Sequence, residues 1–461
     1  MVIFYVFLAL FCLMIGYLIW FQVFQSDSVI SSSYNSRQDL YSEYVIRGDI
    51  LSSDGVVLAY SEEDWDGSET RVYPYGRMFA HVVGYVNNGK SGVEASSNYA
   101  LLKSHSFFLL QIYHDIIGEK NMGDSVVTTL DYDVQEAAYY ALGDNNGAVV
   151  VLEAETGKVL GMVSKPDFDP NTLAENWDSI VNDSESSVLL NRVTSGTYPP
   201  GSVFKIFTTL EYVHENSRTY DNYSYDCQGV LDEYGTEIHC YHNAVHGEED
   251  LIQSFANSCN TSYANIGTTL NINRFSSLLD DMLFNQTLPG SLAGAKSSFT
   301  LTSSDGEAKA MQTAIGQGDT TVTPLHMAMV AAAIDQDGMV YTPYIVDHTE
   351  SDGGTTVRRY RPKSYGSIIS ESDAQLLQQY MSAVVQYGTG TALSGQSYQA
   401  SGKTGSAEYD SEGNSHGWFV GYGSKEGYND IAIAVIVENG GSGSESAVPV
   451  AKQVFDVYFN Q

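Results

Sequence analysis

The stretch "TYPPGSVFK", Thr197–Lys205, decides how this sequence is best interpreted. Two prolines and a glycine precede a serine, and a lysine follows that serine three residues later. Proline suits the residues that lead into a helix, and the first turn of a helix leaves backbone N–H groups without partners. Because the apolar residues after Gly201 follow helical spacing, we expect a buried helix that begins near Ser202. Lys205 then lies on the same helix face as Ser202, as a serine nucleophile and a lysine base would require.

Two further motifs follow in an order that fits this chemistry. A S-x-x-K motif followed by S-x-N and K-T-G is a known catalytic set. No other lysine in the chain has a serine three residues before it. Ser258-Cys259-Asn260 comes next, in "FANSCNTSYANIG", which we expect to be helical. Lys403-Thr404-Gly405 occurs once, on a predicted strand. Together the three motifs predict one active site.

The first two motifs supply the groups that an attack on an amide needs. Ser202 must lose a proton as it attacks, and a neutral Lys205 can accept that proton if burial and nearby positive charge lower its pKa. Ser258 can relay the proton to the leaving amine. Asn260 can hold a substrate amide group.

The third motif supplies binding groups. Lys403 adds positive charge near the base, and Lys403 and Thr404 can bind a carboxylate. The strand edge that carries Gly405 can align a substrate as an added strand. The backbone N–H groups of Ser202 and Ser406 would form the oxyanion hole.

Each motif also has a plain structural interpretation. Ser202 can be an ordinary helix N-cap. Ser258 and Asn260 can be polar residues on a helix surface. Lys403–Gly405 can be a solvated strand edge guarded by a lysine. The joint occurrence of the motifs, in this order, favours catalysis over all three.

Composition limits the classes of partner. The chain has 461 residues, with 22 Lys+Arg against 56 Asp+Glu and a net charge of −34. Nucleic acids and anionic lipid surfaces are therefore poor partners. The sequence has no H-E-x-x-H, P-loop or G-x-G-x-x-G motif, so we expect no cofactor.

The cysteines leave two alternatives open. They are Cys12, Cys227, Cys240 and Cys259. Cys227 and Cys240 can form a disulfide in an oxidising compartment. The same pair with His242 and His246 can instead bind a metal, although no C-x-x-C pair is present. The catalytic chemistry above needs no metal, and we expect none in the active site.

The chain is expected to begin with a membrane anchor. Met1–Phe24 carries no charged side chain and is long enough to cross a bilayer as a helix. "FQVFQSDSV" offers no small-residue cleavage site, so we expect the anchor to be retained. No Lys or Arg precedes the run, so charge does not set its orientation.

The rest of the chain divides into two parts. A hairpin signal at Asp54–Gly55 lies in a small, mostly β or mixed region, and Asp131 is placed to cap a following helix. "GAVVVLEAETGKVLGMVS" predicts a hairpin, and strands return from Ser401 to Gly441. We therefore expect an α+β fold in which one antiparallel sheet encloses an inserted block, mainly helical over 178–303. The predicted boundaries are 1–24 for the anchor, 25–145 for an N-terminal domain with its linking helix, and 146–461 for the catalytic domain.

The motifs and their surroundings resemble the class B penicillin-binding proteins, which are monofunctional peptidoglycan D,D-transpeptidases. "YNSRQDLYSEYVIRGDILSSDGVVLAYSE" is similar to the family's Arg-Gly segment, and "YPYGRMFAHVVGYVNNGKSGVE" is similar to its pedestal. "YPPGSVFK", "SCN", "IGQGDTTVTPLHMA", "SGKTGSAE" and "HGWFVGY" follow in family order. The short pedestal is similar to that of actinobacterial-type members.

This resemblance implies an anchor, a pedestal and a transpeptidase domain with a five-stranded antiparallel sheet between helices. It implies stem peptides ending in D-Ala-D-Ala as substrate, acylation by β-lactams, and a single-pass protein with its catalytic domain outside the cell membrane. It also implies a role in cell wall synthesis beside a polytopic glycosyltransferase, because the pedestal is too short for a glycosyltransferase domain of its own. A D,D-carboxypeptidase or serine β-lactamase is the nearest rival. A non-catalytic β-lactam receptor or divisome scaffold is the rival from another class.

Overall fold

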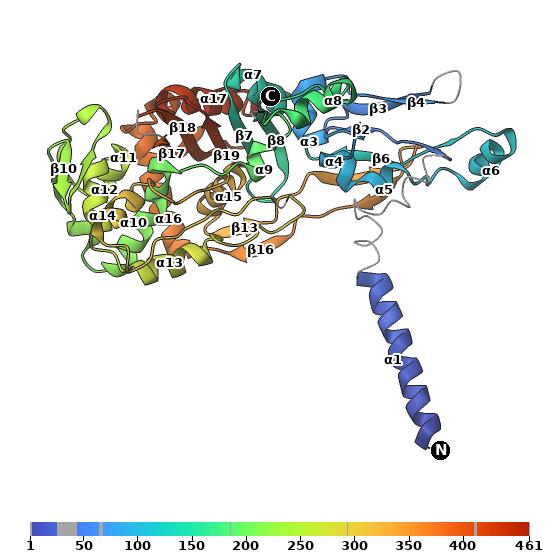
Figure 1. The fold of residues 1–461 in the computed structure, drawn as a ribbon, viewed down its shortest axis with the longest axis horizontal. Coiled ribbons are helices and arrows are strands. Elements are labelled where there is room, and N and C mark those ends of the chain that lie inside the picture. The colour runs from blue at the N-terminus through green and yellow to red at the C-terminus, as the bar shows by residue number, and fades with distance from the viewer. Residues whose placement is uncertain are drawn as a thin grey trace.

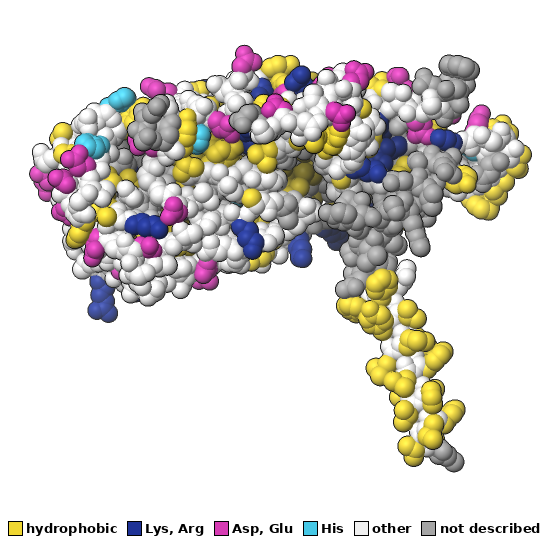
Figure 2. Space-filling model, viewed as in Figure 1, with side chains coloured by type: hydrophobic (Ala, Val, Ile, Leu, Met, Phe, Trp, Pro, Cys, Tyr) yellow, Lys and Arg dark blue, Asp and Glu magenta, His cyan; other side chains and the backbone are white. Residues whose placement is uncertain are grey.

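The computed structural model describes residues 2–24, 44–63, 68–184, 186–292, 294–409 and 413–460. Helix α1 (Val2–Phe24) stands away from the body of the protein (Figure 1), and its apolar side chains are exposed (Figure 2). The span Val2–Gln22 has a mean hydropathy of 2.7 and is long and apolar enough to cross a membrane. The stretch "SEGN" at 411–414, whose composition predicts a turn, lies partly outside the described residues.

The N-terminal region is built on a six-stranded sheet with the order β15-β14-β6-β2-β3-β4 (Figure 1). Its strands are β2 (Ile50–Leu51), β3 (Val57–Glu63), β4 (Glu69–Val72), β6 (Ser125–Thr128), β14 (Val346–Glu350) and β15 (Thr356–Arg359). The predicted hairpin is confirmed, because β2 and β3 pair in antiparallel fashion around Gly55, which has a φ of 85°. Strands β14 and β15 come from the second half of the chain. The N-terminal sheet therefore includes strands from beyond the domain boundary expected at residue 145.

Short elements surround this sheet. They are β1 (Val45–Ile46), η2 (Gly76–Phe79), α3 (Ala80–Val83), α4 (Gly92–Ser96), α5 (Asn98–Leu101), α6 (Phe108–Ile117) and β5 (Asn121–Met122). Within the sheet, β6 pairs with β2 in parallel and with β14 in antiparallel fashion.

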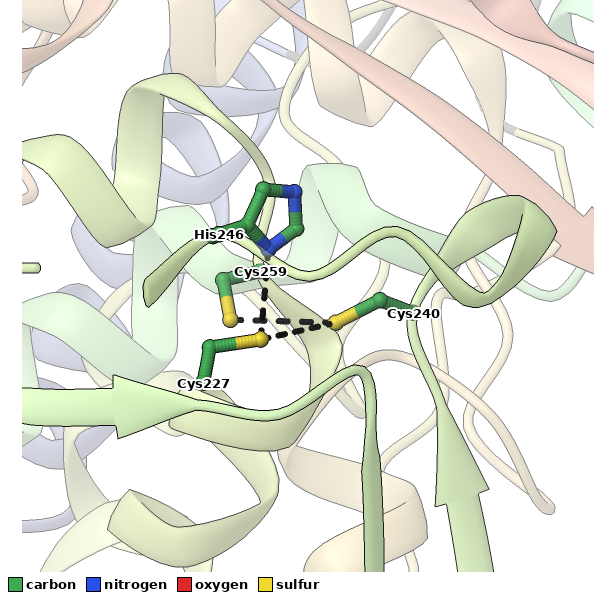
Figure 3. A group of neighbouring side chains, drawn as sticks. All are labelled: Cys227, Cys240, His246 and Cys259. Atoms are coloured by element: carbon green, nitrogen blue, oxygen red, sulfur yellow. Dashed lines mark hydrogen bonds between the residues drawn. The ribbon is translucent and has the colours of Figure 1, made fainter. Parts of the chain in front are cut away.

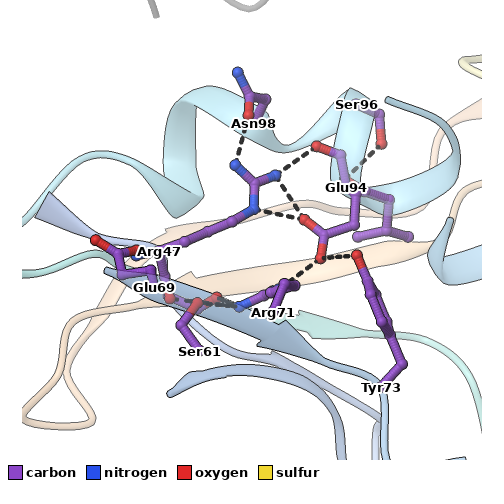
Figure 4. A network of polar contacts seen from close by, with 10 residues as sticks. Arg47, Ser61, Glu69, Arg71, Tyr73, Glu94, Ser96 and Asn98 are labelled. Atoms are coloured by element: carbon purple, nitrogen blue, oxygen red, sulfur yellow. Dashed lines mark hydrogen bonds and ion pairs between the residues drawn. The ribbon is translucent and has the colours of Figure 1, made fainter. Parts of the chain in front are cut away.

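A buried network of ion pairs and hydrogen bonds lies inside the N-terminal region (Figure 4). The two oxygens of the Glu94 carboxylate accept hydrogen bonds from Arg47 Nε at 2.6 Å and Arg71 Nε at 2.7 Å. Arg47 also donates to Asn98, and the Tyr73 hydroxyl donates to Glu94 at 3.3 Å. Burial raises the pKa of Glu94, but the two guanidinium groups outweigh it and hold that pKa below its ordinary value.

The C-terminal region is organised around a five-stranded antiparallel sheet with the order β17-β18-β19-β7-β8. This confirms the antiparallel sheet predicted from sequence and the five strands that the family resemblance implies. The strands are β7 (Gly147–Glu153), β8 (Val159–Lys165), β17 (Gln399–Glu408), β18 (Ser415–Ser424) and β19 (Ile431–Val437). Alternate residues of β19 face opposite sides of the sheet. Ile431, Ile433 and Val435 belong to the core that includes α17 (Gly443–Tyr458), whereas Ala432, Ala434 and Ile436 belong to the core that includes α15 (Pro324–Asp335).

Helices cover both faces of this sheet (Figure 1). α7 (Tyr132–Leu142) and α17 pack together on one face, and α15 packs on the other. The predicted cap of α7 is confirmed, because the Asp131 carboxylate accepts a hydrogen bond from Val134 N at 2.9 Å. α15 begins with a Thr323 N-cap and is almost wholly buried.

The inserted block lies between β8 and β17. Its helices are α8 (Leu173–Asn182), α9 (Arg192–Ser195), η3 (Gly201–Phe204), α10 (Lys205–Glu215), η4 (Tyr220–Asn222), η5 (Tyr241–Asn243), α11 (Leu251–Ala256), α12 (Asn260–Gly267), α13 (Ile272–Asp281), α14 (Glu307–Ala314), α16 (Glu371–Gln386) and η6 (Thr391–Leu393). Its short strands are β9 (Tyr225–Cys227), β10 (Val230–Glu233), β11 (Thr236–His239), β12 (Gly247–Glu249), β13 (Met339–Tyr341) and β16 (Ser364–Ser367). The block is therefore less helical over 225–249 than predicted.

Candidate active site

Ser202 lies in the 3-10 turn η3, which runs directly into α10. Two contacts hold the approach to this turn. The Trp418 indole donates to Pro199 O at 3.1 Å, and Gly201 N donates to Gly316 O at 2.9 Å. Gly201 has a φ of 52°, and a Cβ there would lie 2.5 Å from Ser406 O. Only glycine allows this approach, which places Ser202 beside strand β17.

Lys205 is fully buried at the start of α10. Its Nζ donates to Asn260 Oδ1 at 2.8 Å, to Ser258 O at 2.7 Å and to Ser258 Oγ at 3.3 Å. Burial lowers the pKa of Lys205 to about 8. At such a pKa roughly a tenth to a fifth of this amine is neutral near pH 7 and able to accept a proton, far more than for an ordinary lysine. The hydrogen bond between a base such as Lys205 and its nucleophile, here Ser202, is often completed only when substrate is bound.

The S-x-N motif lies at a junction between helices, and the prediction that it is helical is wrong for its first two residues. Ser258 has a φ of 58°, in the left-handed region. Cys259 is the N-cap of α12, and Asn260 is its first helical residue. The turn aims the Ser258 and Asn260 side chains at Lys205, an alignment that a continuous helix would not give. Left-handed backbone at a non-glycine residue is costly and is often found at functional sites.

Lys403 lies behind the cleft surface. Its side chain is fully buried, and its Nζ donates to Ser258 Oγ at 2.9 Å and to Thr404 O at 2.9 Å. Burial, and then the charge of Lys205, hold the pKa of Lys403 well below its ordinary value. The Ser258 hydroxyl is thus a shared partner of two buried amines.

The residues of all three motifs meet at one cleft of about 550 Å³. The predicted residues on its surface are Ser202, Ser258, Asn260, Thr404, Gly405 and Ser406. Lys205 and Lys403 do not line the cleft, but both reach Ser258 from below. β17 is an edge strand of the five-stranded sheet, so one side of it is free of sheet pairing and faces this cleft.

Comparison with known proteins agrees with this geometry. The family described as "Penicillin binding protein transpeptidase domain" matches residues 147–456, and the "Penicillin binding protein A dimerisation domain" matches residues 47–126. The chain belongs to the penicillin-binding protein transpeptidases. This membership accounts for the antiparallel sheet, the N-terminal region and the order of the motifs.

Related proteins of the family have named activities. A peptidoglycan D,D-transpeptidase, PbpA of Mycolicibacterium smegmatis, is 30% identical over 94% of this chain and 92% of its own length. Penicillin-binding protein A of Mycobacterium tuberculosis, solved as a ceftriaxone acyl-enzyme, is 27% identical with a TM-score of 0.81, covering 91% of this chain and 99% of that one. A transpeptidase domain from Eggerthella lenta is 28% identical with a TM-score of 0.79, covering 90% and 98%.

This penicillin-binding transpeptidase has a cleft residue that the sequence analysis missed. Thr389 lines the cleft, and its hydroxyl lies 2.5 Å from the Thr404 hydroxyl. A Cβ on the preceding Gly388 would lie 2.2 Å from Ala256 O, so the chain must have glycine there. The glycines of "YGTGT" were the available signal.

The cysteine alternatives are also resolved in part. Cys227 and Cys240 are free thiols with their Sγ atoms 3.6 Å apart, so the disulfide is not formed in this structure. His246 contacts Cys227, and Cys259 joins the group. His242, included in the predicted metal site, is not part of this group, although it lines the same cleft as Cys240 and His246.

Proposed function

We propose that this protein is a peptidoglycan D,D-transpeptidase that forms an acyl-enzyme on Ser202. One observation carries the proposal: Ser202, Ser258, Asn260 and Ser406 converge on a single cleft, with the buried Lys205 amine directly beneath. The named activity of the M. smegmatis relative and the acyl-enzyme complex of the M. tuberculosis protein support the reaction class.

In the first step, Ser202 Oγ attacks the carbonyl carbon of the terminal D-Ala-D-Ala peptide bond. Lys205 Nζ accepts the hydroxyl proton, and the backbone N–H groups of Ser202 and Ser406 stabilise the oxyanion. The proton then passes through Ser258 Oγ to the nitrogen of the departing D-Ala. The C–N bond breaks, and an ester joins the substrate to Ser202.

In the second step, an amine of a neighbouring stem peptide attacks this ester. The amine gives up a proton through the same groups, a new amide bond forms, and the Ser202 hydroxyl is restored. The free edge of β17 supports this role because an extended donor peptide can pair with it as an added strand.

The terminal carboxylate of the substrate is assigned to the hydroxyls of Thr404 and Thr389, with Ser406 beside them. This refines the prediction from sequence, in which Lys403 and Thr404 together bind the carboxylate. Lys403 lies one layer deeper, and an incoming carboxylate would favour its protonated form. Its charge then attracts the carboxylate from behind the strand.

Two outcomes of one assay separate the rival activities. Purified protein is given a D-Ala-D-Ala stem peptide with and without an acceptor amine, and released D-Ala and cross-linked product are measured. Cross-linked product in the presence of acceptor supports a transpeptidase. Hydrolysed peptide alone would support a D,D-carboxypeptidase. No release of D-Ala, with no acylation by penicillin, would support a receptor or scaffold.

We further propose that α1 anchors the protein once in the cell membrane, with the catalytic region on the outer side where peptidoglycan lies. The length and hydropathy of α1 support the anchor. Membrane partition of the full chain tests it. Protease added to intact spheroplasts should degrade the catalytic region, whereas protection would place that region on the cytoplasmic side.

We also propose a polytopic glycosyltransferase as the membrane partner. In the N-terminal region, Arg47 and Glu94 are buried against each other and do not offer a contact surface. A group of exposed apolar side chains lies instead on α6 and at its N-cap, where Phe107, Phe108 and Ile116 are 73%, 68% and 77% exposed. Figure 2 shows this apolar group at the far end of the N-terminal region. Phe108→Ser with Ile116→Ser should reduce recovery of the glycosyltransferase from membranes, and unchanged recovery would contradict this surface.

A further inference from the structure

Three buried cysteines and one histidine form a compact group (Figure 3), and Cys240 and His246 of this group also line the cleft. Cys227 ends β9, Cys240 follows β11, and His246 immediately precedes β12. Cys259 is the N-cap of α12. The Sγ atom of Cys240 lies 3.6 Å from that of Cys227 and 3.8 Å from that of Cys259.

The histidine completes the group. His246 Nδ1 lies 3.4 Å from Cys227 Sγ, and all four donor atoms lie within 4.8 Å of one another. A zinc ion bound tetrahedrally, with Zn–S of about 2.3 Å and Zn–N of about 2.05 Å, places sulfur atoms about 3.8 Å apart and sulfur and nitrogen about 3.6 Å apart. The two sulfur–sulfur separations and the sulfur–nitrogen separation given above are within about 0.2 Å of those values.

We propose that Cys227, Cys240, His246 and Cys259 bind one Zn²⁺ ion in a closed tetrahedral site that positions the S-x-N motif. Three thiolates and an imidazole favour zinc over oxygen-preferring cations. Four protein ligands leave no open position, so the ion has a structural role and not one in activating water.

The surroundings of the group fit metal-bound thiolates. The Thr261 hydroxyl donates to Cys227 Sγ at 3.2 Å and contacts Cys259 Sγ at 3.4 Å. The backbone N–H of Ser262 donates to Cys259 Sγ at 3.5 Å. Outer-shell donors of this kind orient metal ligands. Cysteines that serve only as small apolar residues need neither these donors nor a ring nitrogen aimed at them.

A disulfide accounts for the group less well. Cys240 lies almost equally close to two other sulfur atoms, so either disulfide would leave the third thiol and the imidazole without a role. A disulfide also needs its sulfur atoms at about 2.05 Å, whereas these separations are those of ligands around a common ion.

The site is connected directly to the catalytic groups through Cys259. This residue separates Ser258 from Asn260, the two partners of Lys205. Asn260 Nδ2 also donates to His239 O at 2.9 Å, one residue before Cys240. The other ligands come from two-stranded sheets, β9 with β12 and β10 with β11, which are marginally stable by themselves. Zinc would tie these sheets to the start of α12 and fix the left-handed turn at Ser258.

Zinc analysis of the full-length protein in detergent micelles tests the site. After dialysis against zinc and removal of free metal, we expect about one zinc per chain. Cobalt substitution should give thiolate-to-metal charge-transfer bands and tetrahedral d–d bands. His246→Gln should lower zinc affinity by more than the roughly 10–100-fold that loss of an outer-shell group costs. His242→Gln, four residues away and outside the group, should retain the metal.

Absence of retained zinc and of cobalt charge transfer in the unaltered protein would overturn the site. So would intact-mass evidence for a disulfide between Cys227 and Cys240 in protein prepared under zinc. Because both measurements use the unaltered chain, the test does not depend on whether a variant folds.

The positioning role rests on the proposed function and has a separate readout. Removing zinc should slow acylation by penicillin at least tenfold, and adding zinc should restore it. His246→Cys, which offers another zinc ligand, should retain metal and acylation, whereas His246→Gln should lose both. Unchanged acylation after zinc removal would overturn the positioning role. A zinc-loaded protein that is never acylated would overturn the proposed function and leave the zinc site standing.

Discussion

The substitution Glu94→Gln tests how the N-terminal region is held together. Glu94 is fully buried and forms ion pairs at 2.6 Å with Arg47 and 2.7 Å with Arg71, whose side chains are 8% and 4% exposed. Glutamine keeps the shape of the side chain but removes its charge. Two guanidinium groups would then remain buried without the carboxylate that pairs with both of them.

The expected magnitude follows from that burial. Removing one partner of a buried ion pair costs about 3–5 kcal/mol, because an uncompensated charge stays in the interior. Since about 1.4 kcal/mol is a tenfold change, local opening should become easier by roughly two to four powers of ten. Hydrogen exchange of backbone amides in β2 and β4 measures this opening.

A matched control separates burial from charge. Arg77 pairs with Asp167 at 3.0 Å, but its side chain is 57% exposed. Arg77→Gln should therefore change the opening free energy by less than about 1 kcal/mol. An acceleration below about tenfold for Glu94→Gln, or one equal to that of Arg77→Gln, would refute this account of the network.

The same network predicts a dependence on pH. The pKa of Glu94 is lower in the folded protein than its ordinary value of 4.5. The unfolded chain therefore binds this proton first as pH falls. The stabilisation is fully present above about pH 4.5 and is lost as pH falls through the lower folded pKa. Glu94→Gln should lack this contribution.

Three further predictions concern the catalytic region. The rate of acylation by penicillin should rise with pH through the pKa of about 8 that burial gives Lys205, because the neutral amine is the base. A flat rate profile from pH 6 to 9 would exclude Lys205 as the base. Burial lowers the pKa of His326 to about 4, so the unfolded chain gains a proton first and stability should fall as pH drops from about 6.5 to 4. Thermal unfolding of His326→Asn should show a weaker dependence on pH over this range. An equal dependence in the variant would contradict the assignment. Thr389→Val should slow acylation by about tenfold, because it removes one hydroxyl hydrogen bond worth about 1 kcal/mol or more. Ser394→Ala, at the exposed end of η6, should leave the acylation rate unchanged.

Much of the site was predictable because its catalytic residues belong to short sequence motifs. Pro199–Lys205 combines helix-start residues, a nucleophile and a base, and the local structure follows the sequence closely. The sheet strands were equally clear, since their apolar runs and the hairpin at Asp54–Gly55 are local signals.

What could not be predicted depends on contacts between distant segments. The left-handed Ser258 lies in a sequence with helical composition, and tertiary packing overrides that propensity. Strands β14 and β15 join the N-terminal sheet across more than two hundred residues, which no local pattern records. His246 and not His242 joins the cysteines, because the turn around Asn243 decides which ring reaches them.

The site of acylation tests the central claim most directly. The full-length protein is incubated with a fluorescent penicillin, digested, and its acylated peptide is located by mass spectrometry. We expect the acyl mass on Ser202, and complete loss of labelling in a folded Ser202→Ala variant. An acyl group on another serine, or labelling that survives Ser202→Ala, would contradict it.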